Sequence, residues 1–194
     1  MSADSVRAHL RALATIATAT ESLATEVAEV VDEVIATLRG GGTLYFCGNG
    51  GSAADAQHLA AEYVVRFART RPGLAAVALT VDTSILTAAS NDFGFDEVFA
   101  RQVEALGRPG DLLFLHSTSG RSPNLLRAAE AARAGGLRTV AFLARDGGPL
   151  RGHVDRALVI PTEITAHAQE IHIALGHVIC DEVDRHFAQG GETT

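Results

Sequence analysis

Residues 44–62 read LYFCGNGGSAADAQHLAAE, and this stretch decides the fold. A short apolar run, Leu44–Cys47, leads into the glycine-rich turn Gly48–Ser52 and then into a predicted helix over 53–68. Glycines let the backbone approach an anion closely, and the start of the helix offers free N–H groups to it. The turn is neither a G-x-G-x-x-G nor a Walker motif, and alone it is equally typical of a connection that binds nothing.

The same alternation of short apolar run and helix-length segment repeats along the chain. Apolar runs without polar alternation indicate parallel strands that are covered on both faces. With right-handed crossovers, they predict an α/β fold, a doubly wound five-stranded parallel sheet of flavodoxin-like type. The predicted strands are Leu44–Cys47, Leu74–Leu79, Asp111–His116, Arg138–Leu143 and Ala157–Ile160, and the predicted helices are 53–68, 84–90, 96–106, 123–135 and 165–188.

Two helices are expected before the sheet, over residues 4–40, with a break near Thr18–Ser22 and an end at Gly40–Gly42. Their apolar stripes need a surface to cover them, on this domain or on another subunit. We therefore expect one domain over 1–194. It comprises a helical extension at 1–40, an α/β sandwich at 41–188 and a tail at 189–194.

The amino-acid composition argues against several classes of function. The 194 residues are 47% hydrophobic, and 16 Lys+Arg against 23 Asp+Glu give a net charge of −7, which argues against a nucleic-acid-binding surface. No apolar run approaches the roughly 18–20 residues that span a bilayer, and no targeting signal is evident. Cys47 and Cys180 form no disulfide framework. We expect a cytoplasmic protein without nucleic-acid or membrane partners.

Hydroxyl side chains crowd the end of the third predicted strand. Ser117, Thr118, Ser119 and Ser122 supply four hydroxyls in six residues at the start of a predicted helix. N-capping needs one of them, or two, so the surplus favours an anion site. Acidic residues near the glycine turn favour a monophosphate on a neutral sugar over a polyphosphate.

A histidine and a carboxylate share one face of the helix after the glycine turn. His58 and Glu62 are four residues apart, which suits a metal ion or an acid–base pair, although a solvated helix face is the ordinary explanation. The last helix carries Gln169, His172 and His177 among apolar residues, where a lone histidine is usually a hydrogen-bonded core residue.

These motifs together resemble the phosphoheptose isomerases of the sugar-isomerase (SIS) fold. The string Gly48–Glu62 carries the resemblance, and Asn91–Phe95, Ser117–Ser122 and Gln169–His172 follow in the same order, so that nearly the whole chain is covered. The resemblance implies an aldose–ketose isomerase that converts sedoheptulose 7-phosphate to D-glycero-D-manno-heptose 7-phosphate through an enediol, for heptose biosynthesis. It also implies a homo-oligomer, a tetramer as in the family.

The resemblance also implies roles for individual residues. Glu62 and His177 match the base and the acid, and His58, Glu62, Gln169 and His177 match the ligands of a zinc ion, one per subunit. The positions that match substrate contacts are Asn49, Gly50, Gly51, Ser52, Glu62, Asn91, Asp92, Ser117, Thr118, Ser119, Ser122 and Gln169. The chain departs from the family pattern at His167-Ala168, where Arg-Ile is common, at His116, where an aliphatic residue is usual, and at Arg121.

Other functions share this fold. One alternative is a non-catalytic SIS module that binds a phosphosugar or the replication initiator, and another is an isomerase of a related ketose phosphate in secondary metabolism. The presence of both Glu62 and His177 favours an enzyme. Gln169 and His177 are eight residues apart, about 12 Å along a helix and about 80° around it. Either the helix is distorted, or the metal uses only some of the four groups, or a neighbouring subunit contributes part of the site, and we expect the last.

Overall fold

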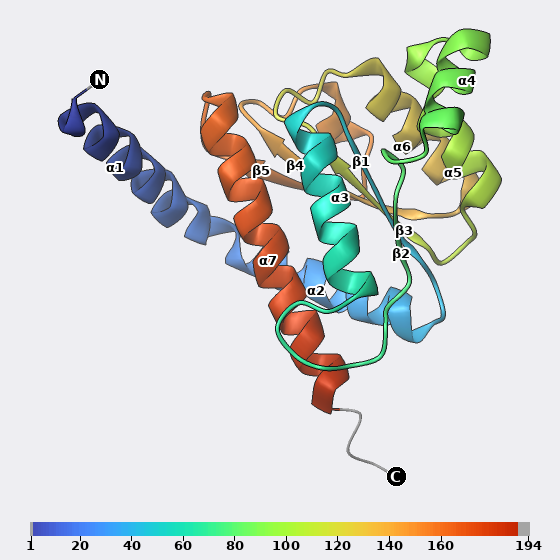
Figure 1. The fold of residues 1–194 in the computed structure, drawn as a ribbon, viewed down its shortest axis with the longest axis horizontal. Helices are drawn as coiled ribbons and strands as arrows, with labels where there is room; N and C mark the ends of the chain where they lie inside the picture. Colours follow the sequence, from blue (N-terminus) through green and yellow to red (C-terminus); the bar gives the residue numbers. More distant parts are fainter. Residues whose placement is uncertain (1, 190–194) are drawn as a thin grey trace.

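The computed structural model describes residues 2–189 and shows a five-stranded parallel sheet between two layers of helices (Figure 1). The order β2-β1-β3-β4-β5 is that of the flavodoxin-like doubly wound fold, which confirms the predicted fold class. The strands are β1 (Leu44–Gly48), β2 (Ala76–Ala78), β3 (Leu112–His116), β4 (Arg138–Ala144) and β5 (Arg156–Ile160).

Seven α-helices and three short 3-10 turns are present in the described residues. The break predicted near Thr18–Ser22 is a 3-10 turn at Glu21–Leu23. The helices are α1 (Ala3–Thr20), α2 (Ala24–Arg39), α3 (Gly51–Val64), α4 (Thr83–Phe93), α5 (Ala100–Leu106), α6 (Pro123–Gly135) and α7 (Thr165–Gln189), and the other 3-10 turns are Phe95–Glu97 and Pro149–Gly152.

The two cores follow from the alternation of side chains along each buried strand. In β1, Leu44 and Phe46 point to the core formed with α2, α3 and α7, whereas Tyr45 and Cys47 point to the core formed with α4, α5 and α6. Both faces are apolar, so the strands read as continuous apolar runs. Cys47 and Cys180 are buried and free.

Several predicted boundaries were wrong. The run 74–79 contributes only three residues to β2, an edge strand that pairs with β1 alone and is preceded by Pro72 and Gly73. Helix α4 extends to Phe93, and the segment 96–106 divides into a 3-10 turn and α5. Of the expected tail 189–194, Gln189 ends α7, and the rest lies outside the described residues.

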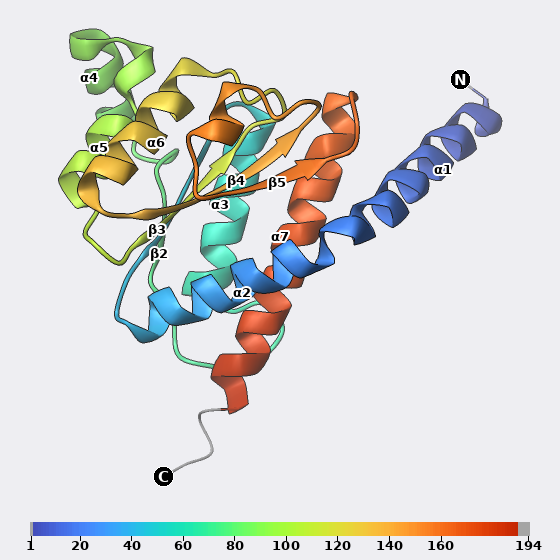
Figure 2. The same cartoon turned by 180° about the vertical axis from the view of Figure 1, so that it is seen from behind.

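Helix α1 projects away from the sandwich (Figures 1 and 2). Leu13 and Ile16 pack against the end of the sheet near α7, and Thr20 is buried. Val6 and Leu10 are more than half exposed. Within the described part of the chain, the first half of the predicted apolar stripe is therefore left uncovered. No helix among residues 2–189 is both long and apolar enough to cross a membrane.

A buried ion pair joins the segment after α3 to α7. Arg71 Nε donates to the carboxylate of Asp184, and both side chains are almost wholly buried. Arg71 also donates to the carbonyl oxygens of Glu62 and Tyr63, at 2.8 and 2.9 Å. Burial by itself would raise the pKa of Asp184, but backbone N–H donors and the Arg71 guanidinium hold it below its usual 3.8. This arginine thus fixes the end of α3 against α7.

Replacing Asp184 with asparagine is expected to lower the free energy of unfolding by about 3–5 kcal/mol, because Arg71 would remain buried without a counter-charge. The lowered pKa means that the carboxylate stabilises the fold above its usual pKa and loses this effect as the pH falls through the folded-state value. Urea unfolding between neutral and acidic pH should therefore show a steeper loss of stability in the wild type than in Asp184→Asn. The partly exposed Asp181→Asn is the control and should change little.

Candidate active site

Three helices begin at the carboxyl edge of the sheet and enclose a small polar cavity. Helix α3 begins at Gly51, α6 at Pro123 and α7 at Thr165. The cavity, about 240 Å³ in volume, is lined by Asn49, Ser52, His116, Ser117, Thr118, Ser119, Ser122, Thr165 and Gln169. No arginine is among them, and the chain has no lysine. Helix N-termini and N–H or O–H donors thus supply the positive potential that an anion would meet here.

The hydroxyl loop after β3 keeps its hydroxyl hydrogens available. Ser117 Oγ accepts from Gly120 N at 3.0 Å, and Ser119 Oγ accepts from Arg121 N at 3.3 Å. Because both oxygens act as acceptors, their hydrogens are free to be donated to a ligand. Gly120 has a φ of +62°, and a Cβ there would lie 1.9 Å from the carbonyl oxygen of Gly147, so the loop requires glycine at this position.

The glycine turn after β1 is tied to α6 by an amide pair. Asn49 and Asn124 exchange two side-chain hydrogen bonds of 2.9 Å, and Asn124 is almost fully buried. Sequence reasoning missed Asn124 and the cavity residue Thr165. An amide directly after Ser122-Pro123, in the first turn of the predicted helix 123–135, was the available signal for Asn124.

Gln169 reaches the glycine turn from α7. A Cβ at Gly51 would lie 2.7–2.9 Å from the amide atoms of Gln169, so only glycine allows this approach. The contact places Gln169 beside the hydroxyl loop, as one wall of the cavity.

His116 lies at the end of β3, fully buried and stacked on Phe142 with the ring centroids 4.8 Å apart. Burial, with a smaller effect of His172, lowers the pKa of His116 to about 3, so the ring is neutral at physiological pH. Neither ring nitrogen has a hydrogen-bond partner among the described residues.

A second group of titratable side chains lies further along α3 and α7, which run side by side (Figure 1). His58 Nε2 is 2.7 Å from His177 Nε2 and 3.4 Å from Glu62 Oε1. A Cβ at Gly176 would lie 2.6 Å from Leu59, so the glycine permits the close helix contact that joins the two histidines. Burial and His58 lower the pKa of His177, against the opposing effect of Glu62.

Three of the four predicted metal ligands thus meet at this helix contact. Two imidazoles and a carboxylate are donors that zinc prefers, so the residue types fit the ion. Gln169 does not join them, since it lines the hydroxyl cavity eight residues before His177. Within residues 2–189, the group of His, Cys, Asp and Glu ligand atoms that all lie within 4.8 Å of one another is a different one, at His9, His167 and Glu170.

Comparisons with known proteins establish the family of this chain. The family profile of the SIS domain matches residues 9–144. A phosphoheptose isomerase of Roseiflexus sp. (strain RS-1) is 56% identical over 165 residues, which cover 85% of this chain and 84% of the relative. This chain belongs to the phosphoheptose isomerases of the SIS-domain family.

Solved structures of phosphoheptose isomerases share the fold over nearly the full chain. The enzyme from Neisseria gonorrhoeae superposes with a TM-score of 0.89 at 42% identity, covering 94% of this chain and 98% of the other. The one from Francisella tularensis gives 0.91 at 33% identity, covering 95% and 100%. The members of this family are aldose–ketose isomerases, as the sequence resemblance implied.

Five predicted substrate-contacting residues do not line the cavity. Gly50 and Gly51 belong to the adjoining glycine turn and Glu62 to the His58 cluster, whereas Asn91 and Asp92 lie away from both groups. Asn91 and Asp92 are exposed at the end of α4 and bond to each other, with Nδ2 to Oδ1 at 2.8 Å. Neither lines the hydroxyl cavity, and α4 lies on the side of the molecule opposite to α1 (Figures 1 and 2). A phosphoheptose isomerase could use them only in another subunit's site or after a rearrangement.

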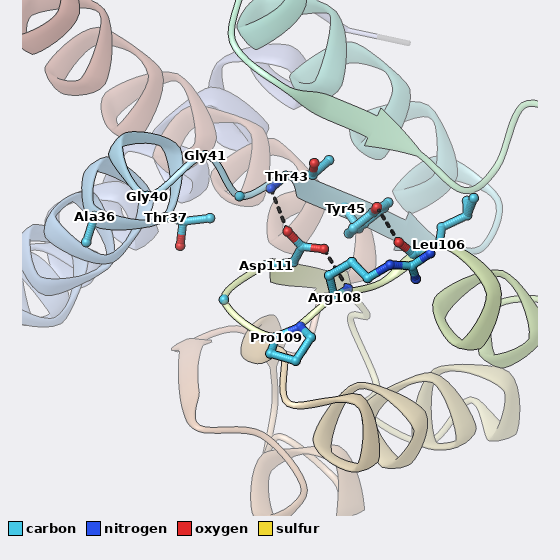
Figure 3. A pocket seen from close by; sticks show the side chains of 12 residues that line it. Ala36, Thr37, Gly40, Gly41, Thr43, Tyr45, Leu106, Arg108, Pro109 and Asp111 are labelled. Atoms are coloured by element: carbon cyan, nitrogen blue, oxygen red, sulfur yellow. Dashed lines mark hydrogen bonds between the residues drawn. The ribbon is translucent and has the colours of Figure 1, made fainter.

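A larger cavity, about 500 Å³, lies at the opposite edge of the sheet (Figure 3). Its carboxylate, Asp111, accepts from the backbone N–H groups of Thr43 and Arg108, both at 2.8 Å. Tyr45 donates to the Leu106 carbonyl at 3.2 Å. These groups hold two turns together at the amino ends of β1 and β3, away from every motif of the family, and we assign the cavity no function.

The close packing of Gly176 against Leu59 predicts the effect of adding a methyl group at this position. In Gly176→Ala the added methyl group forces α3 and α7 apart, which should lower the free energy of unfolding by about 1–3 kcal/mol. It should also raise the pKa of His177 toward its ordinary value, because the ring loses both its burial and its His58 neighbour. Urea unfolding and an NMR titration of the histidines measure the two effects.

Gly152→Ala is the matched control, since a Cβ there meets nothing within 4 Å. An unchanged His177 pKa in a folded Gly176→Ala protein would show that the glycine does not set the histidine contact.

Proposed function

We propose that this chain interconverts sedoheptulose 7-phosphate and D-glycero-D-manno-heptose 7-phosphate, as an early step of heptose biosynthesis in the cytoplasm. The observation that carries the proposal is that α3 and α7 connect two sites, the hydroxyl-lined cavity and the His58–Glu62–His177 cluster. A hydroxyl-lined cavity at three helix N-termini suits the phosphate, and the His58–Glu62–His177 cluster further along the helices suits proton transfer.

The phosphate is bound by the hydroxyl loop. Ser117 and Ser119 donate their free hydroxyl hydrogens, and Ser122, which makes no capping hydrogen bond with the described residues, donates a third. Asn49, Gly50, Gly51, Ser52, Thr118 and Gln169 complete the contacts on this side. Binding energy gained at the phosphate holds the remote carbons in position for reaction.

Glu62 and His177 move the protons. Glu62 removes a proton from C1 of the ketose while His177, whose pKa is lowered by burial and by His58, donates one to the oxygen at C2. The resulting cis-enediol takes up a proton at C2 and loses one from the C1 hydroxyl, which gives the aldehyde. The 2.7 Å contact between the histidine Nε2 atoms fits a single shared hydrogen, so His58 sets which nitrogen of His177 carries it.

A zinc ion, one per subunit, would be held by His58, Glu62 and His177. Gln169, the fourth ligand that the family resemblance implies, would have to come from a neighbouring subunit, because the Gln169 of the same chain lines the hydroxyl cavity. When bound, it would polarise the oxygens of the substrate and stabilise negative charge that develops on them.

The Glu62→Gln protein is expected to bind the substrate nearly as well as the wild type and to lose turnover by a factor of at least about 10². The amide keeps the size of the side chain but cannot take the proton from carbon. Turnover is measured with a panel of ketose phosphates, with and without a chelator, and binding by calorimetry.

Glu130→Gln, an exposed carboxylate on α6, is the control for the loss of charge. Near-normal turnover of Glu62→Gln would remove Glu62 from the base role, and turnover of a ketose phosphate other than sedoheptulose 7-phosphate would assign the chain to that substrate. Binding without turnover in the wild type would instead favour a phosphosugar-binding module.

Ser119→Ala and Ser122→Ala should each weaken substrate affinity by about 1–3 kcal/mol, the value of a hydrogen bond to a charged group, and leave turnover at saturation nearly unchanged. Calorimetry with phosphorylated and unphosphorylated sugar isolates the effect. If the variants bind both sugars as the wild type does, the phosphate lies elsewhere.

The working unit in this proposal is a homo-oligomer, a tetramer as in the family, with sites completed at subunit contacts. Three features support it: the exposed apolar residues of α1, the position of Asn91 and Asp92 outside their own chain's cavity, and the half-exposed His58 side chain. An apolar groove of about 380 Å³ between the α1–α2 junction and α7 offers a surface for a neighbour. A monomeric mass in solution would contradict it.

A further inference from the structure

A second His/Glu cluster lies where α1 meets the start of α7. His167 Nε2 is 3.4 Å from Nδ1 of His9, and Glu170 Oε1 is 3.6 Å from Nε2 of the same histidine. One ligand atom from each of the three side chains lies within 4.8 Å of the other two. None of the three has a part in the isomerase reaction described above.

The sequence places these side chains on facing helix surfaces. His167 and Glu170 are three residues apart on α7 and therefore share a face. His9 lies four residues before Leu13 and seven before Ile16, the two α1 residues that pack against the sheet end. His9 thus continues the contacting stripe of α1 and gives that helix its first contact with the body.

Burial leaves two polar atoms of the cluster unsatisfied. His167 is only 2% exposed, and its Nδ1 has no hydrogen-bond partner among residues 2–189. Oε2 of Glu170 is likewise buried without a partner in that range. Buried polar groups without partners are rare in folded proteins. These two atoms are the second nitrogen and the second oxygen of side chains whose other atoms, Nε2 of His167 and Oε1 of Glu170, face His9. The side chain of His9 is half exposed, so the cluster is open to solvent on one side.

We propose that His9, His167 and Glu170 bind a divalent zinc ion at a site separate from the His58 cluster. Two imidazoles and a carboxylate are a common zinc donor set, with a fourth position left for water. Bond lengths near 2.0–2.1 Å place tetrahedral ligand atoms about 3.3 Å apart, whereas the 3.4 and 3.6 Å distances found here run to Nδ1 and Nε2 of His9, respectively. The exposed His9 ring must rotate so that a single nitrogen faces the ion.

The ion would fasten α1 to the first turns of α7. Without it, the first half of α1 is held by few contacts, since residues 2–11 are exposed. Glu170 directly follows Gln169, which lines the hydroxyl cavity, so the ion would couple the position of α1 to that wall of the cavity. A hydrogen-bonded chain His167–His9–Glu170 without metal is the competing explanation, and the experiment separates the two.

The test measures zinc content in the full chain. Protein is stripped with a chelator, dialysed against Zn²⁺ and analysed by mass spectrometry of the metal, in parallel with isothermal calorimetry. The variants are His9→Gln, His167→Gln and His177→Gln. Because His167 is buried and its replacement could unfold the protein, the exposed His9 carries the main test. His153→Gln, a histidine that bonds to the Pro149 carbonyl far from both clusters, is the control.

We expect His9→Gln and His167→Gln each to lose one zinc ion per subunit relative to the wild type, with affinity for that ion reduced at least about tenfold. His177→Gln should keep this ion. Unchanged zinc content and affinity in His9→Gln would overturn the proposal and leave the hydrogen-bonded chain. The experiment also distinguishes this proposal from zinc binding at the His58 cluster. If that cluster binds no zinc, the wild type holds a single ion, which His9→Gln removes and His177→Gln leaves in place.

Discussion

The contact between α3 and α7 is the constraint on which the rest of the site depends. Near the start of α3, Gly51 makes room for Gln169, and in the middle Gly176 makes room for Leu59. Beyond its end, Arg71 binds Asp184 in a buried ion pair. Two glycines and one ion pair thus set the distance between the helices along their length, and with it the 2.7 Å approach of His58 to His177. A site built on two packed helices keeps its geometry better than one built on loops.

The cavity at the carboxyl edge shows how an acidic protein can bind an anion. The net charge is −7, and neither lysine nor arginine lines the cavity. The positive potential comes instead from the N-termini of α3, α6 and α7, whose first N–H groups have no partner within their own helix. Parallel strands bring these N-termini to one edge because every crossover returns the chain to the same side. The topology therefore creates the potential that attracts an anion, and the serine hydroxyls add hydrogen-bond donors that orient it.

The sequence predicted the sheet because the strands are buried on both faces, and apolar runs such as 112–116 have no other simple explanation. The apolar run 74–79 overestimated the length of β2. Only three residues of this edge strand pair with β1, and apolar composition alone does not mark where the pairing begins and ends. The strand-end motifs were placed correctly at one edge by the parallel topology. Contacts between distant segments could not be predicted: the Asn49–Asn124 pair and the meeting of His9 with His167 depend on how helices pack, which periodicity does not encode.

The separation of Gln169 from the His58 cluster has the same origin. A helix advances about 1.5 Å per residue, so side chains eight positions apart cannot share one small site without a distortion of the helix or a contribution from another chain. The structure keeps α7 regular from Thr165 to Gln189, and the two parts of the site stay apart. The spacing suits a substrate with a phosphate at one end and a reacting carbon several bonds away. It leaves His58 half exposed, in a position where water weakens every charge interaction. Excluding that water requires a cover that residues 2–189 do not supply, and the unburied apolar face of α1 is the surface from which a symmetric assembly could provide it.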